Sequence, residues 1–164
     1  SSMCERPVKP PSYVISGNLA RRSSVSGWPW RSMRQACVRA TLPSVIDRRG
    51  YVLIVSSLAA YTAAPGLAPY NASKAAVHML SQSLGSELAK YNIRVNTIAP
   101  GLFKTPLLGS LPEEAQKSLG AQVPHPSRLG DPDEYGALAV HIVENPMLNG
   151  ETIRLDGAIR MAPR

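Results

Sequence analysis

The chain has 164 residues, enough for one domain with a sizeable core but too few for two such domains. Hydrophobic residues make up 44% and charged residues 18% of it, the composition of a globular protein, and no apolar run reaches the roughly 18–20 residues that a membrane helix needs. The two cysteines, Cys4 and Cys37, are too few for a disulfide framework and lack metal-ligand partners at a useful spacing, which favours a reducing compartment and predicts no metal site.

The formal net charge of +7 is concentrated in residues 1–50, which hold nine Lys or Arg against two acidic residues. A basic segment of this kind can attract nucleic acids or acidic membranes, but residues 1–30 contain no nucleic-acid recognition motif. We therefore expect neither a nucleic-acid nor a membrane partner. The segment also resembles a transit peptide, because it is rich in Arg and Ser and poor in acids. We expect a cytoplasmic location, with a mitochondrial one as the alternative.

Residues 1–30 show no steady helical or strand period, although SYVISGN (12–18) is compatible with one short strand ending at Gly17. We therefore divide the chain into an irregular basic segment at 1–30, for which disorder is one interpretation, and an ordered part at 31–164.

Helix and strand patterns alternate from residue 31 onward. YVLIVSS is a continuous apolar, β-branched run, typical of a strand buried on both faces. GDPDEYG carries a helix start, with Asp131 as the cap and Pro132 in the first turn. In chain order we predict a helix at 31–49, a strand at 51–56, a helix at 70–90, a strand at 93–98, a short helix at 112–121, a helix after Asp131 and a strand at 151–155. Alternation of this kind predicts an α/β fold with a parallel sheet.

Tyr70 and Lys74 are the first candidates for chemistry. Residues four apart lie on the same face of a helix, and an ammonium beside a phenol stabilises the phenolate. Ser57 follows the strand at its carboxyl end, where α/β sheets bind ligands. Each residue also has a structural interpretation: the pair can be an ordinary helix start, and Ser57 can be a hydroxyl that bonds its own loop.

The combination resembles the short-chain dehydrogenase/reductase family. Ser57 stands thirteen residues before Tyr70, and YNASKAAV is close to the helix that carries this family's Tyr and Lys. IRVNTIAPG matches the strand that follows, and Pro100-Gly101 followed by Thr105 matches the segment that borders the nicotinamide. The similarity extends over residues 33–157. The last third of the chain, with PSRLGDPDEY and NGETIRLDGAIRM, is most similar to the branch that acts on 3-hydroxyacyl-CoA.

The resemblance implies a truncated Rossmann-like doubly wound sheet, of which residues 31–164 are the catalytic and substrate-binding half. It implies that Tyr70 is the acid/base, that Lys74 supports it and holds the nicotinamide ribose, and that Ser57 orients the substrate oxygen. It also implies NAD as the cofactor, an alcohol, ketone or acyl-CoA as the substrate, and a homo-oligomer. The cofactor-binding residues that it implies are Tyr70, Lys74, Pro100, Gly101, Leu102, Phe103 and Thr105.

The glycine turn that holds the pyrophosphate in this family has no clear counterpart. The candidate ISGNLARRS supplies Gly17, but Arg21 and Ser23 stand where glycines let the backbone approach the phosphates. The ribose-reading acidic residue is also missing, so NADP stays an alternative to NAD. Two other functions remain open: a 3-oxoacyl-thioester reductase that uses NADPH, and a catalytically impaired fragment that acts as an oligomerisation or regulatory subunit.

Overall fold

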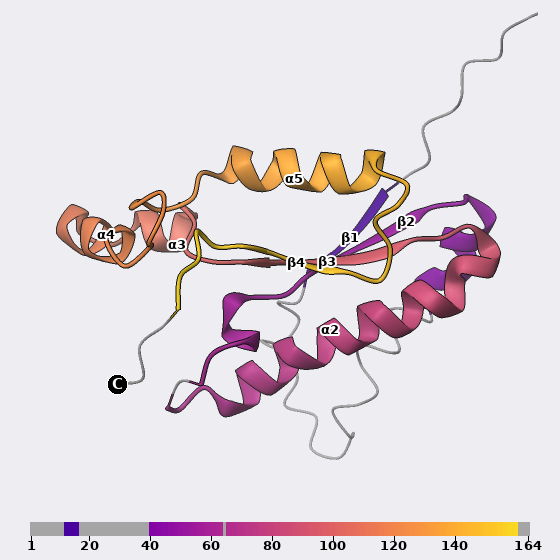
Figure 1. The fold of residues 1–164 in the computed structure, drawn as a ribbon, viewed down its shortest axis with the longest axis horizontal. Coiled ribbons are helices and arrows are strands. Elements are labelled where there is room, and N and C mark those ends of the chain that lie inside the picture. The colour runs from indigo at the N-terminus through magenta and orange to yellow at the C-terminus, as the bar shows by residue number, and fades with distance from the viewer. Residues whose placement is uncertain (1–11, 17–39, 64, 161–164) are drawn as a thin grey trace, which may run out of the picture.

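The computed structural model describes residues 12–16, 40–63 and 65–160 (Figure 1). Within these residues, four strands form one sheet in the order β1-β2-β3-β4, and every neighbouring pair is parallel. The strands are β1 (Ser12–Ser16), β2 (Tyr51–Val55), β3 (Val95–Pro100) and β4 (Thr152–Leu155). The α/β class and the parallel, adjacent arrangement of the last three strands are therefore confirmed.

The helices connect the strands and cover the sheet. Residues 40–47 are helical, in agreement with the described part of the helix predicted at 31–49. The other helices are η2 (Leu58–Ala60), α2 (Ala68–Leu88), η3 (Ala89–Tyr91), α3 (Pro106–Gly109), α4 (Glu113–Gly120) and α5 (Pro132–Glu144). None of the described helices is both long and apolar enough to span a membrane.

The sheet lies between α2 on one face and α5 on the other (Figure 1). Side chains of a strand alternate between the two faces, and β2 supplies both cores: Val52 and Ile54 pack in the cluster with α2, whereas Tyr51 and Leu53 pack in the cluster with α5. Burial on both faces explains why this strand has no polar alternation.

Strand β3 is displaced from its predicted position. The prediction began at residue 93, but the Ile93 amide donates to Leu88 O at the end of the preceding helices, so the strand begins at Val95. At the other end, the strand continues past the predicted end at residue 98 and includes Pro100. Proline has no N–H to donate, but no hydrogen bond to β2 is lost, because the pairing of β2 with β3 already ends at Val55 and Ile98.

Strand β1 lies within the segment that we expected to be irregular. The sequence allowed one short strand there, and residues 12–16 pair in register with β2. β1 precedes the boundary that we placed at residue 30, yet it belongs to the same sheet as the strands that follow this boundary. The rest of residues 1–30 lies outside the described residues, so their irregular character stays a prediction.

The carboxyl ends of β3 and β4 approach closely at Gly101. A Cβ on Gly101 would lie 2.7 Å from Asp156 Cβ and 2.8 Å from Asp156 Cα. We expect Gly101→Ala to destabilise the protein by about 1–3 kcal/mol, the usual cost of overpacking a fixed backbone contact. Urea denaturation measures this cost.

Gly136→Ala in α5 is the matched control, because a Cβ there meets nothing within 4 Å. It should leave stability unchanged or raise it by up to about 1 kcal/mol, since alanine favours the helix. Equal stabilities for the two variants would contradict the close approach.

Candidate active site

The predicted site residues follow the carboxyl ends of β2 and β3. Ser57 is the second residue after β2, and Gly101 comes directly after β3. Because the two strands are parallel and paired, these ends lie at the same edge of the sheet, where α/β proteins bind their ligands.

Lys74 links α2 to the end of β2. Its side chain is nearly inaccessible, with 3% of the residue exposed, and its Nζ donates to Val55 O over 3.1 Å. The same Nζ lies 5.8 Å from the ring centroid of Tyr70, which is 42% exposed. The predicted stacking of Tyr70 and Lys74 is therefore present, with a buried ammonium next to an accessible phenol.

Tyr70 also lies in the first turn of α2, which begins at Ala68 and has Pro69 at its start. The N-terminal end of a helix carries a partial positive charge. The start of α2 and the Lys74 ammonium are therefore two positive groups close to the Tyr70 side chain.

Ser57 bonds its own loop, as its structural interpretation predicted. It is the N-cap of η2, and its Oγ accepts from the Ala59 amide over 3.2 Å. This bond uses a lone pair of the hydroxyl and not its proton, so a donor remains for a substrate oxygen. Within the described residues no direct hydrogen bond joins Ser57 to Tyr70, so their shared role stays a prediction.

Ser56 and His78 were missed by the sequence analysis. Ser56 is buried; its Oγ donates to Lys74 O over 3.1 Å and lies 2.8 Å from His78 Nε2. Burial lowers the pKa of His78 from its usual value. The available signal was the spacing of Tyr70, Lys74 and His78, each four residues apart and therefore on one face of α2.

The segment after β3 is fixed by backbone contacts to residue 130. Gly130 donates to Leu102 O over 2.8 Å, and the Lys104 amide donates to Gly130 O over 2.9 Å. The hydroxyl of Thr105 accepts from Leu108 N at the start of α3. The contact with the nicotinamide that is predicted for Thr105 would have to be made in addition to this bond.

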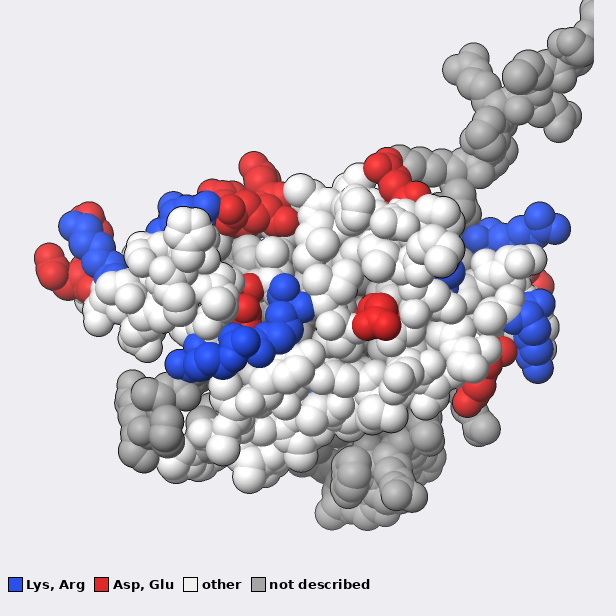
Figure 2. All heavy atoms as spheres, in the orientation of Figure 1, with Lys and Arg blue, Asp and Glu red and all other residues white. Residues whose placement is uncertain are grey.

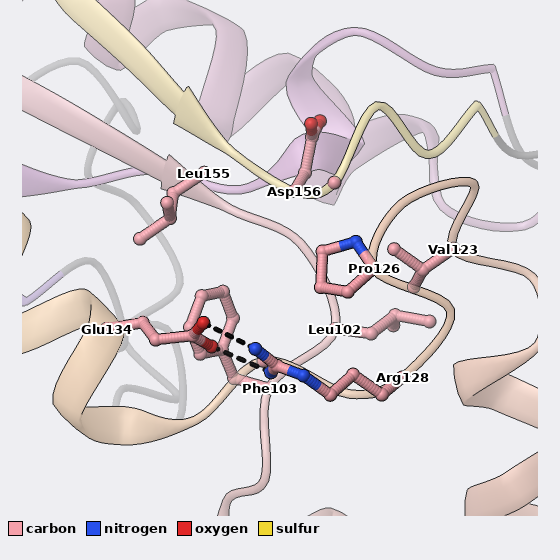
Figure 3. Close-up of a pocket in the computed structure, with 10 residues that line it drawn as sticks. Leu102, Phe103, Val123, Pro126, Arg128, Glu134, Leu155 and Asp156 are labelled. Atoms are coloured by element: carbon pink, nitrogen blue, oxygen red, sulfur yellow. Dashed lines mark hydrogen bonds and ion pairs between the residues drawn. The ribbon is translucent and has the colours of Figure 1, made fainter.

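A cavity of about 80 Å³ lies between this segment and the end of β4 (Figure 3). Leu102, Phe103 and Leu155 supply apolar wall. At its rim Arg128 and Glu134 form two hydrogen bonds, of 2.9 and 2.6 Å. These bonds lower the pKa of Glu134 to about 2, so its carboxylate stays ionised at neutral pH. Arg128 and Glu134 therefore line this side of the cavity as an ion pair.

The described residues fit the nicotinamide and ribose end of a dinucleotide. A phenol and a buried ammonium lie beside the end of β2, and the Pro100-Gly101 turn follows the adjacent strand. The candidate pyrophosphate turn that begins at Gly17 lies outside the described residues.

Comparison with known proteins gives concordant matches. The chain matches the family described as Enoyl-(Acyl carrier protein) reductase over residues 32–159. It is 53% identical over 121 residues to 3-hydroxyacyl-CoA dehydrogenase type-2 from Mus musculus. That match covers 74% of this chain but 46% of the mouse protein, so the chain spans less than half the length of this relative.

Two solved structures have the same fold over most of the chain. One is 3-hydroxyacyl-CoA dehydrogenase type-2 from Mycobacterium avium, with a TM-score of 0.73, 39% identity and coverage of 77% of this chain and 52% of that one. The other is a 3-oxoacyl-[acyl-carrier protein] reductase with bound NAD from Brucella melitensis, with a TM-score of 0.65, 32% identity and coverage of 77% and 47%. Together with the Tyr70–Lys74 pair at the end of β2, these matches show that the chain belongs to the short-chain dehydrogenase/reductase family of nicotinamide-dependent oxidoreductases.

Proposed function

We propose that this chain is the catalytic half of an NAD-dependent oxidoreductase that acts on secondary alcohols, with 3-hydroxyacyl-CoA as the substrate class. The observation that carries the proposal is the Lys74 ammonium, buried against Val55 O and 5.8 Å from the Tyr70 ring. The mouse relative, a 3-hydroxyacyl-CoA dehydrogenase by name, supports the substrate class.

Oxidation of such an alcohol removes a proton from the hydroxyl and a hydride from the carbon that bears it. Bound NAD would supply the hydride acceptor. Ser57 would donate a hydrogen bond to the substrate oxygen, and the Tyr70 phenolate would take the hydroxyl proton. Lys74 would hold the phenolate and the ribose through its ammonium group. In the reverse direction Tyr70 returns the proton to the oxygen of the ketone.

A reductase that uses NADPH and a 3-oxoacyl thioester is the second candidate. The similarity to the Brucella melitensis reductase, at 32% identity, supports the 3-oxoacyl substrate, although that structure holds NAD. Proton transfer by Tyr70 would be the same in both enzymes, so the site geometry favours neither. Cofactor and substrate preference therefore have to be measured.

The test is turnover by the 164-residue chain at millimolar cofactor. One reaction contains NAD and 3-hydroxybutyryl-CoA, and the other contains NADPH and acetoacetyl-CoA; nicotinamide absorbance follows both. Faster turnover in the first reaction supports the proposal, and faster turnover in the second supports the reductase. If neither reaction shows turnover that depends on Tyr70, both proposals fail.

A third candidate, an oligomerisation or regulatory subunit, is supported by the surface of α2. The exposed residues of this helix between Ala72 and Ser86 carry no charge, and Met79 is 61% exposed. In Figure 2 the charged side chains lie mostly toward the two ends of the visible face. An uncharged helix surface fits a second copy of the chain, so we propose a homo-oligomer, which analytical ultracentrifugation tests for this chain with or without turnover.

A further inference from the structure

The end of β2 holds Lys74 at two points. Val55 O accepts from Lys74 Nζ over 3.1 Å, and the adjacent Ser56 Oγ donates to Lys74 O over 3.1 Å. Consecutive residues of one strand end therefore fix both the backbone and the ammonium of the same helical residue. Both residues are buried, since the lysine and the serine are each only 3% exposed.

The direction of the Ser56 hydrogen bond to Lys74 O determines whether His78 donates to Ser56 or accepts from it. A hydroxyl has one proton to donate, and in this structure Ser56 donates it to Lys74 O. The 2.8 Å contact between Ser56 Oγ and His78 Nε2 is a hydrogen bond only if Nε2 carries a proton and donates it to the serine oxygen. Both contacts of Ser56 Oγ can be hydrogen bonds at once only in the neutral tautomer that carries its proton on Nε2.

The surroundings of His78 add a second reason for the neutral form. Its ring lies 4.8 Å from the ring of Tyr61, and the Arg154 guanidinium, which is paired with Asp156, lies 4.6 Å from that Tyr61 ring. Burial against these groups lowers the pKa of His78, which favours the neutral ring.

We propose that His78 is a positioning residue for Lys74, and that it acts through Ser56. By donating to Ser56 Oγ, His78 keeps the serine proton directed at Lys74 O, which fixes the backbone of α2 at Lys74. The ammonium is then held toward Val55 O and Tyr70. The inference rests on the proposed function, in which Lys74 supports Tyr70.

The test compares three variants by NMR and by turnover. His78→Leu removes the donor, His78→Gln replaces it with an amide N–H, and His141→Leu changes an exposed histidine of α5 as the control. In the wild type we expect one His78 tautomer, protonated at Nε2. We expect the Lys74 side-chain signals to shift and broaden in His78→Leu, to return toward wild type in His78→Gln, and to stay unchanged in His141→Leu.

Turnover distinguishes positioning from packing. His78→Leu should lower kcat about fivefold, the loss of one neutral hydrogen bond, and His78→Gln should recover most of it at an equal free energy of unfolding. Unchanged Lys74 signals in His78→Leu, or a His78 protonated at Nδ1, would overturn the inference. Loss of the Lys74 signals without any effect of Tyr70→Phe on turnover would instead overturn the proposed function and leave the positioning role standing.

Discussion

Replacing Tyr70 by phenylalanine is expected to lower kcat by a factor of about 10²–10⁴, the usual contribution of a positioned acid or base. The phenylalanine ring fills the same space but has no proton to exchange with the substrate oxygen. Because Tyr70 is 42% exposed, we expect the folded state to be unaffected. Steady-state kinetics with 3-hydroxybutyryl-CoA measure the loss, and circular dichroism checks the fold.

Tyr91→Phe is the matched control for this variant. Tyr91 is also 42% exposed, and a lysine, Lys90, lies with its Nζ 5.1 Å from the Tyr91 ring centroid. This second Tyr–Lys pair lies at the opposite end of α2 from Tyr70, before β3 begins. We expect no change in kcat. Equal losses in the two variants, or no loss in Tyr70→Phe, would show that Tyr70 does not transfer the proton.

Replacing Arg94 by methionine is expected to destabilise the fold by about 3–5 kcal/mol, because hydrogen bonds to a charged group contribute about 1.5–3 kcal/mol each and are not fully additive. The guanidinium donates to Ile142 O, Val143 O, Asn145 O and Leu148 O over 2.5–3.0 Å. These carbonyls lie at or just beyond the C-terminal end of α5, the negative end of the helix. A methionine would leave several of them without a donor.

Urea denaturation at neutral pH measures this effect. Lys117→Met is the control, since Lys117 pairs with Glu113 in α4 and its side chain is 67% exposed; we expect its free energy of unfolding to change little. Arg94→Lys should fall between the two, because one ammonium cannot reproduce the fork of the guanidinium. A loss below about 1 kcal/mol in Arg94→Met would mean that water replaces Arg94 at these carbonyls.

The sequence was sufficient to predict those elements and contacts that depend on residues close together in the chain. β2 was predicted from a continuous apolar run, because both of its faces are buried. α5 was predicted from its cap, and the structure has both halves of the capping box between Asp131 and Glu134. The Tyr70–Lys74 contact followed from helical geometry alone.

Contacts between distant parts of the chain could not be predicted in this way. Arg94 bonds carbonyls that are 48 to 54 residues away in the sequence, and no local pattern marks an arginine for such a role. The Ser56–His78 contact joins residues 22 apart, and its existence depends on how β2 and α2 pack. The bounds of β3 likewise depended on where its neighbour β2 ends.

A nicotinamide-fluorescence titration with NADH is the most direct test of the claim that Tyr70 and Lys74 form a hydride-transfer site. We expect saturable binding by the 164-residue chain with a Kd in the millimolar range. The missing glycine turn would remove two or three hydrogen bonds to the pyrophosphate, each worth about 1.5–3 kcal/mol. Lys74→Met should weaken binding about tenfold or more, and Lys90→Met should leave it unchanged. Equal affinities in the two variants, or no binding at any concentration, would contradict the account.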